Sequence, residues 1–297
     1  MKVLIVGLPL FAERLQKELT KFDSNNTYYN LNTYYSKKDK LKALFLIPFV
    51  DVVYSINGTL DDSGVINLAL KFNKKVMFTW VGTDVVKASK LTVKNQKYIQ
   101  EVRHYCEVGW IQEELKEIGV NAKILNFVSF NTRYELSTPE TSRLQVLSYI
   151  PDNRADFYGI NEYIQLANSF PDIDFMIAGA TAEKYFPLPE NLVALGWVSD
   201  MNSLMNKVQV CIRFPEHDGL SSFILESLAR GKKVIYKYPF NYCESCGTLE
   251  EMKLSLSQID SDFKNGIEIS NLEGKKFIES HFNTDKILGA LVNEMMN

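Results

Sequence analysis

Residues 218–226, with the sequence DGLSSFILE, place two carboxylates, Asp218 and Glu226, on either side of small polar residues. In a helix that begins inside this segment, Ser222 and Glu226 lie one turn apart on the same face. Gly219, seven residues before Glu226, lies in the same direction ahead of the first turn. The free N–H groups and the dipole at a helix start favour a negatively charged or oxygen-rich ligand. Gly219 lets such a ligand approach the backbone closely. The segment therefore has the features of a ligand-binding turn.

The helix that carries this polar face is predicted over residues 222–230. Ser221 is its expected N-cap, and Gly231 is expected to end it. Its apolar side chains point in other directions and are expected to pack against a sheet. The alternative is that Glu226 only belongs to the solvated face of a half-exposed helix.

Strands and helices alternate along the first half of the chain. Strands are predicted at 2–7, 50–56, 75–80 and 121–128, and helices at 8–22, 62–73 and 98–119. Short apolar strands that alternate with helices form buried parallel sheets. The first half is therefore predicted to be an open α/β unit.

The same alternation restarts after a polar stretch at residues 131–143, which is predicted to be a linker. Strands are predicted at 144–150, 173–179, 192–198, 208–214 and 232–237, and helices at 158–171, 200–207 and 222–230. The fold class is α/β, with two Rossmann-like parallel-sheet domains, 1–138 and 139–297, facing each other across a cleft. Ligands of such sheets bind outside the carboxyl ends of the strands.

Residues 218–226 and the stretch LARGKKVI that follows resemble the donor-site signature of retaining glycosyltransferases with the GT-B fold. That group is family 4 in the usual sequence classification, also described as glycosyl transferases group 1. The resemblance extends to FPDIDFMIAG and NLVALGWVSDM in the second half and to WVGTDV in the first. It implies a donor-binding second domain and an acceptor-side first domain.

By this resemblance, Glu226 accepts hydrogen bonds from the ribose hydroxyls of a nucleotide-sugar, since a carboxylate has two acceptor oxygens. Asp218 stands where the family usually has Glu and contacts the transferred sugar. The backbone amides of Gly219, Leu220 and Ser221 bind sugar or phosphate oxygens.

Further donor-side residues follow from the same resemblance. Ser222 belongs to the polar face of the helix, and His217 is either a sugar contact or a loop histidine. Trp197 lies in the loop that faces the nucleotide base in the family, and the backbone of Val198 reads the base edge. The alternative for Trp197 is a packing residue.

Positive charge beside the diphosphate stabilises the negative charge that develops as the glycosidic bond breaks. The family usually supplies an Arg and a Lys after the first strand of the second domain. Here Arg154 is available, and Tyr158 stands in the place of the Lys. Arg213 is a candidate substitute; the alternative is an arginine that only ends a strand.

In the first half, Gly82, Thr83 and Asp84 follow a predicted strand and are expected on the acceptor side of the cleft. Asp84 either orients an acceptor hydroxyl or caps the segment that follows. The sequence does not separate the two.

Several other classes of function are disfavoured. Gly7 is followed by Leu-Pro-Leu, so the glycines of a dinucleotide fingerprint are missing and a nicotinamide-dependent enzyme is poorly supported. Four cysteines are too few for a disulfide framework, and Cys243 and Cys246 lack a second half-site for zinc. No metal site and no cofactor other than the nucleotide-sugar substrate are expected.

The charge of the chain is unevenly distributed. Residues 1–140 carry 19 Lys and Arg against 15 Asp and Glu, and residues 141–297 carry 14 against 21. An excess of four positive charges is too diffuse to predict nucleic-acid binding. The stretch KKDKLKALFLIPF groups lysines ahead of apolar residues, which predicts either peripheral contact with an anionic membrane or a helix with one solvated and one core face.

The sequence thus predicts a metal-independent, retaining glycosyltransferase that acts on a glycan, lipid-linked or other hydroxyl acceptor. It contains no run of about 18 uncharged apolar residues, so a cytoplasmic protein, peripheral at most to the inner membrane face, is expected. The alternative is a catalytically silent protein of the same fold that binds nucleotide-sugars or glycans, because the family Lys is missing.

Overall fold

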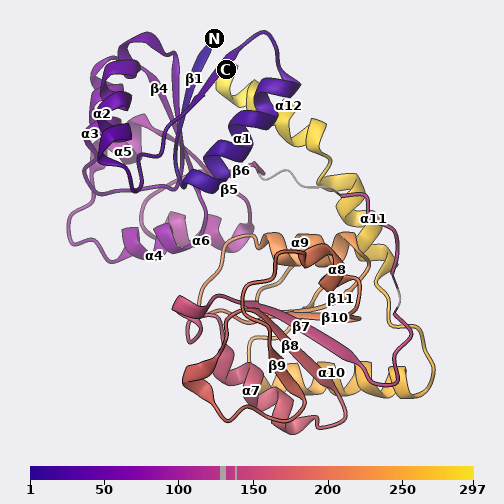
Figure 1. Ribbon diagram of the computed structural model, residues 1–297. Coiled ribbons are helices and arrows are strands. Elements are labelled where there is room, and N and C mark those ends of the chain that lie inside the picture. The colour runs from indigo at the N-terminus through magenta and orange to yellow at the C-terminus, as the bar shows by residue number, and fades with distance from the viewer. Residues whose placement is uncertain (128–131, 138) are drawn as a thin grey trace. The chain divides into compact units, whose positions relative to one another are not determined.

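The computed structural model describes residues 1–127, 132–137 and 139–297. They form two compact units (Figure 1). Of the described residues, the first unit contains 1–127, Asp218–Leu220 and Thr284–Asn297. The second contains the others up to Asn283.

The first unit is built on a six-stranded parallel sheet with the order β2-β1-β3-β4-β5-β6. Its strands are β1 (Lys2–Gly7), β2 (Thr27–Asn30), β3 (Val52–Ile56), β4 (Lys75–Trp80), β5 (Arg103–Cys106) and β6 (Ala122–Ile124). Strand β3 is buried along its whole length, and β1 and β4 are buried except at their first residues. Burial on both faces explains why these strands are continuous apolar runs in the sequence.

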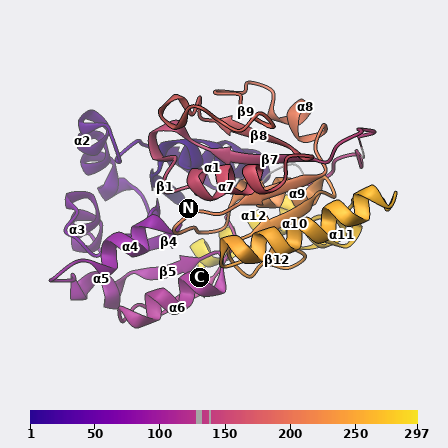
Figure 2. The ribbon, with the colours of Figure 1, turned by 90° about the horizontal axis from the view of Figure 1, so that it is seen from below.

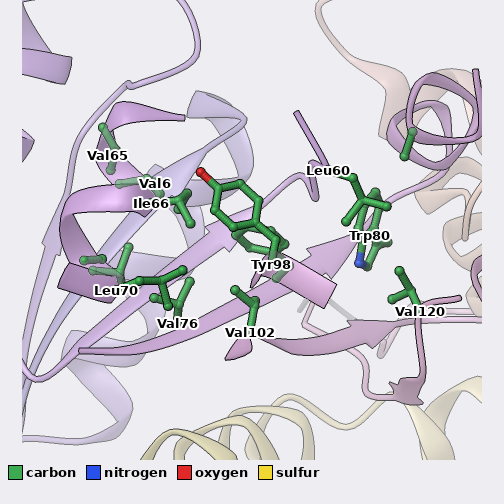
Figure 3. Close-up of a cluster of buried hydrophobic side chains, with 14 of the residues drawn as sticks. Val6, Leu60, Val65, Ile66, Leu70, Val76, Trp80, Tyr98, Val102 and Val120 are labelled. Carbon is green, nitrogen blue, oxygen red and sulfur yellow. The ribbon is translucent and has the colours of Figure 1, made fainter. Parts of the chain in front are cut away.

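Helices cover both faces of this sheet. They are α1 (Pro9–Phe22), α2 (Lys37–Leu46), the 3-10 helix η1 (Ile47–Phe49), α3 (Gly64–Lys71), α4 (Thr83–Ser89), α5 (Gln96–Glu101), α6 (Gly109–Glu117) and α12 (Thr284–Met296). Ile5 packs in an apolar cluster with α1 and α12, whereas its neighbour Leu4 packs in a second cluster with α2 to α6. Figure 3 shows part of the second cluster around Tyr98 and Trp80.

The second unit has another six-stranded parallel sheet, with the order β12-β11-β10-β7-β8-β9. Its strands are β7 (Gln145–Ile150), β8 (Asp174–Gly179), β9 (Leu192–Ala194), β10 (Val210–Arg213), β11 (Lys233–Tyr236) and β12 (Glu244–Ser245). The strand order reverses between β7 and β10, which are neighbours in the sheet. Such a reversal is the usual ligand-binding position of an open α/β sheet.

Helices also flank this second sheet, as Figure 2 shows from below. They are α7 (Ile160–Ser169), α8 (Met201–Met205), α9 (Ser222–Ala229), α10 (Leu249–Lys264) and α11 (Leu272–His281), with the 3-10 helices η2 (Asp152–Arg154) and η3 (Glu183–Tyr185). Helices α7 and α10 pack on one side of β7, β8 and β10, and α8 packs on the other. Of the helices in the described ranges, none is both long and apolar enough to span a membrane.

The single helix predicted over 98–119 is wrong. Helix α5 ends at Glu101, the strand β5 follows, and α6 begins only at Gly109. Strand β5 pairs with β4 and is buried after its first residue; there, Trp80 Nε1 donates a hydrogen bond to His104 Nδ1 at 3.1 Å. Burial in the sheet thus overrides the helical spacing of the sequence.

The compact units also differ from the single division into 1–138 and 139–297. Helix α12 belongs to the first unit because Leu288, Leu291 and Met295 are buried in the apolar cluster that contains α1. The segment Asp218–Leu220 makes its contacts in the first unit as well. Residues 131 and 138 of the predicted linker lie outside the described residues.

Candidate functional site

In the second unit, the loops that follow β7 and β10 touch at the reversal of strand order. The backbone N–H of Glu216 donates to the Phe157 carbonyl oxygen at 2.7 Å. Gly159 has a φ of 77°, and a Cβ there would overlap the carbonyl oxygen of Phe214. Only glycine fits this position without strain. The loop containing Arg154 is thereby fixed against the loop that leads to α9.

The two candidate cations of the second unit both contact Tyr158. The Arg213 guanidinium carbon lies 4.8 Å from the centroid of the Tyr158 ring, and that of Arg154 lies 5.4 Å from it. Arg154 also lies 3.9 Å from the Phe157 ring centroid. Arg213 is buried, whereas Arg154 is exposed. The fold thus brings together two arginines that are 59 residues apart in the sequence.

A cavity of about 670 Å³ adjoins these loops. It is lined by residues 152–157 after β7, residues 181–185 after β8, and Glu216. Arg154 therefore faces the cavity, together with Lys184, whose Nζ lies 3.0 Å from an Asp156 carboxylate oxygen. Among its described lining residues, the cavity does not include Glu226, Trp197 or Arg213.

Helix α9 begins at Ser222, as predicted, and ends at Ala229, one residue before the predicted end. Ser221 is the N-cap, but its side chain makes no capping hydrogen bond. Gly231 follows the helix with a φ of 70°. Leu225 and Leu228 are buried, and the Glu226 side chain is 30% exposed. Glu226 is therefore on the partly open face of an otherwise buried helix, together with the half-buried Ser222.

Trp197 and Val198, in the loop after β9, differ in exposure. Trp197 is 81% exposed, so it is not a packing residue in this unit. Val198 is half-buried and packs against the apolar cluster that contains α8. Exposed indole at the carboxyl end of a strand leaves a flat apolar surface available to an aromatic ligand.

His217 lies near Tyr238, with the ring centroids 6.4 Å apart and the planes at 78°. The carbonyl oxygen of the preceding Glu216 accepts hydrogen bonds from Lys237 Nζ and the Tyr238 hydroxyl, at 3.3 and 3.4 Å. The loop before α9 is thus fixed by the two residues that follow β11.

Asp218, Gly219 and Leu220 make their contacts in the first unit. Trp110 Nε1 donates to the Asp218 carbonyl oxygen at 2.9 Å, and Leu220 packs against the cluster of Figure 3. Gly219 lies so close to Gly82 that a Cβ on Gly82 would be 2.7 Å from the Gly219 nitrogen. Gly82 and Gly219, which the sequence indicated for separate reasons, therefore allow their two backbone segments to approach each other closely.

Asp84 is buried, and its carboxylate organises the turn before α4. Oδ1 accepts the N–H groups of Val81, Gly82 and Val85 at 3.0, 2.9 and 3.1 Å. Oδ2 accepts the N–H of Gly58 at 2.8 Å. Burial raises the pKa of Asp84 to about 6, although the backbone N–H groups lower it. At neutral pH the carboxylate is thus ionised and capped by backbone donors.

Asp84 also faces a smaller cavity of about 180 Å³ in the first unit. Residues 57–61 after β3, Tyr34 and Lys87 line it as well. Thr83, half-buried in the first turn of α4, and Gly82 do not line it.

The sequence did not predict a role for Arg230 and Lys232, which are both buried after α9. Basic residues directly after an apolar helix, in the stretch ARGKK, were the only available signal. Within the described ranges, no three His, Cys, Asp or Glu side chains are grouped so that they could hold a metal ion.

Comparison with known proteins gives matches among solved structures only. No family model and no curated protein matches the chain. HepE of Anabaena in complex with UDP is similar over 100% of both chains, with 11% identity and a TM-score of 0.73. Sucrose-phosphate synthase of Thermosynechococcus elongatus is similar over 100% of this chain and 99% of its own, with 11% identity and a TM-score of 0.72.

A glycosyltransferase of Rickettsia africae is similar over 99% of this chain and 97% of its own, with 12% identity and a TM-score of 0.69. Identities this low show the fold alone. The chain has the GT-B fold, with two Rossmann-like parallel-sheet units, as the sequence predicted.

Proposed function

We propose that this protein is a retaining glycosyltransferase that transfers a sugar from a nucleotide-sugar to a hydroxyl of a glycan or lipid-linked acceptor. The observation that carries the proposal is the full-length likeness to HepE, which has been solved with UDP and with UDP-glucose. The candidate residues at the carboxyl ends of β7, β9 and β10 support it, because ligands of open parallel sheets bind there.

In this proposal Glu226 accepts the two ribose hydroxyls, and the exposed Trp197 contacts the base near the backbone of Val198. Asp218 and the amides of residues 219–221 bind hydroxyls of the transferred sugar or phosphate oxygens. Ser222 and His217 complete the donor contacts. The carboxylate of Glu226 is partly exposed, as such a role requires.

The reaction breaks the bond between the anomeric carbon and the diphosphate and forms a bond from that carbon to the acceptor oxygen on the same face. A departing phosphate oxygen takes the acceptor's proton. Arg154 and Arg213 stabilise the negative charge that develops on the diphosphate. Tyr158 supports this assignment, because both guanidinium groups lie beside its ring.

On the acceptor side, we assign Asp84 a positioning role. Its carboxylate is bound to backbone N–H groups of the turn, so it fixes Gly82 and Thr83 at the end of β4. The Thr83 hydroxyl is then in position to hydrogen-bond to the acceptor. Direct contact of Asp84 with an acceptor hydroxyl through the small cavity is the alternative.

A catalytically silent nucleotide-sugar or glycan-binding protein is the second candidate. Tyr158 in the place of the family Lys favours it, because one cation of the usual pair is replaced by an aromatic ring. The two candidates share the donor site and differ only in turnover.

A thermal-shift screen across nucleotide-sugars, followed by transfer and hydrolysis assays, tests the proposal. A ligand that binds only the folded protein raises the melting temperature according to its affinity. Glu226→Gln should weaken donor binding by about tenfold, because hydrogen bonds to a charged acceptor are stronger than those to a neutral one. The exposed Glu250→Gln serves as the control. No shift with any nucleotide-sugar would sink the proposal, and binding without turnover would favour the silent protein.

We further propose that α2 contacts the surface of an anionic membrane, at the cytoplasmic face. Ala43 of α2 is buried, and Leu44 and Leu46 pack against the core cluster of the first unit, so α2 has the core face that the sequence left open; its other side is exposed. Leu41, Phe45 and Phe49 are 56%, 73% and 71% exposed, and the lysines at 37, 38, 40 and 42 are exposed beside them. Exposed apolar residues next to lysines suit the interface of anionic lipids.

Sedimentation with vesicles tests this contact. Vesicles containing phosphatidylserine should carry the protein down, and phosphatidylcholine vesicles should not. A Phe45→Ser and Phe49→Ser double variant should lose most of the binding, whereas Leu254→Ser, exposed on α10, should keep it. Equal binding to both kinds of vesicle would contradict an electrostatic contact.

A further inference from the structure

Three cationic side chains near the end of α9 contact the segment 132–137. Lys232 Nζ donates to the Ser137 carbonyl oxygen at 2.6 Å, and Lys275 Nζ donates to the Tyr134 carbonyl oxygen at 2.6 Å. The guanidinium carbon of Arg230 lies 3.6 Å from the centroid of the Tyr134 ring. At that distance the ring face attracts the cation. The segment therefore covers the end of α9.

Arg230 connects this segment to Glu226 on the preceding turn of the helix. Its Nη1 donates to the Glu226 carbonyl oxygen at 2.9 Å and lies 3.7 Å from Glu226 Oε2. Its Nη2 donates to Asn202 Oδ1. The Arg230 side chain is 0% exposed, whereas that of Glu226 is 30% exposed. The guanidinium is thus fixed on several sides, and the carboxylate keeps an open side.

Stability alone is a poor explanation for this arginine. Burying a guanidinium costs free energy that an ion pair often only offsets, and an apolar residue of similar volume usually serves a core at least as well. Arg230 Nε has no hydrogen-bond partner in the part of the chain that the structure describes, and Lys232 adds a second buried cation nearby. The arrangement is costly for a side chain that would only fill space.

We propose that Arg230 is a positioning residue for Glu226. Its guanidinium lies 3.7 Å from Oε2, and this attraction orients the carboxylate to accept the ribose hydroxyls of the nucleotide-sugar. The Tyr134 ring also contacts the guanidinium and helps to hold it in place. The inference rests on the proposed function, because it assigns Arg230 to the ribose contact of that same site.

Binding of UDP, measured by calorimetry, tests the role of Arg230. Arg230→Met keeps the apolar stem and should raise the Kd for UDP about tenfold, because small displacements of a binding group are costly. It should raise KM for the donor with kcat nearly unchanged. Arg230→Lys should restore part of the affinity, and Tyr134→Leu should weaken binding by a smaller factor. Lys275→Met, which contacts the same segment but not Glu226, is the matched control and should bind as the wild type does.

A double-mutant cycle separates positioning from a general structural effect. If Arg230 acts through Glu226, the Glu226→Gln and Arg230→Met pair should bind UDP no more weakly than Glu226→Gln alone. Additive losses, or unchanged binding by Arg230→Met, would overturn the inference. Should Arg230→Met fail to fold, Arg230→Lys and Tyr134→Leu carry the same cycle. A wild type that binds no nucleoside diphosphate would instead overturn the proposed function on which the inference rests.

Discussion

Lys232 is a buried group whose titration contributes to the pH dependence of stability. The side chain is 1% exposed, and its Nζ donates to the Ser137 carbonyl oxygen. Burial lowers the pKa of Lys232 from 10.5 to about 8, with a further lowering by Arg230 and an opposing effect of the Cys211 thiol. Below pH 8 the folded protein therefore carries a buried charge that the unfolded chain keeps in water.

The sign of the effect follows from proton binding. Between about pH 8 and 10.5 the unfolded chain holds the Lys232 proton more tightly than the folded protein, so the Lys232 contribution to stability improves as the pH rises. The full cost below pH 8 is on the order of 3 kcal/mol, because the pKa differs by about 2.5 between the unfolded and folded chain. Relative to Lys232→Met, the wild type should gain about 2 kcal/mol in the free energy of unfolding between pH 7.5 and 9.5.

Urea unfolding of both proteins at the two pH values measures this gain. Lys207→Met, at an exposed position, controls for the loss of a positive charge and should show no such pH dependence relative to the wild type. If the free energy of unfolding changed by the same amount with pH in the wild type and in Lys232→Met, Lys232 would not titrate in this range.

At the scale of the element, Gly159 determines how closely the loops after β7 and β10 approach. It combines a φ of 77° with a position where a Cβ would overlap the Phe214 carbonyl oxygen. Gly266 has a similar φ of 75°, but a Cβ there would meet nothing within 4 Å. The two glycines share a left-handed φ and differ in the close approach, so Gly266 is a control for the backbone strain alone.

Gly266→Ala should cost about 1 kcal/mol of stability, which is the strain of a left-handed alanine. Gly159→Ala should cost about 2 kcal/mol more, because the loops must separate as well. It should also weaken nucleotide binding, since Arg154 and His217 are on the displaced loops. Denaturant midpoints and calorimetric affinities provide the measurement. Equal costs for the two variants would refute the close approach as the reason for Gly159.

Most elements of the second unit could be predicted from the sequence, and the contacts of the site could not. Alternation of apolar residues and the N-cap and stop signals located α9, because these depend on neighbours in the sequence. The pairing of Arg213 with Tyr158 depends on β10 lying beside β7 in the sheet. No local pattern encodes that adjacency. The same holds for β5, whose burial between β4 and β6 overrode its helical spacing.

At the scale of the whole molecule, the last helix belongs to the unit that begins the chain. Helix α12 packs beside α1, and Lys75 Nζ donates to the Met295 carbonyl oxygen at 2.9 Å. The Tyr105 hydroxyl donates to Glu294 Oε2 at 2.8 Å. The sequence division at residue 138 missed this return, because an amphipathic terminal helix does not indicate which sheet it covers. Helix α12 is therefore part of the first unit.

Leu291 tests this dependence, since it is 0% exposed in the cluster of α1 and α12. Leu291→Ala should lower the stability of the first unit by about 2–5 kcal/mol, through lost burial and the cavity left behind. Leu254→Ala, 72% exposed on α10, should change it by less than about 0.5 kcal/mol. Fluorescence of the buried Trp80 reports mainly on the first unit, so its denaturant midpoint should fall for Leu291→Ala alone. An unchanged midpoint would mean that the first unit is stable without the packing of α12.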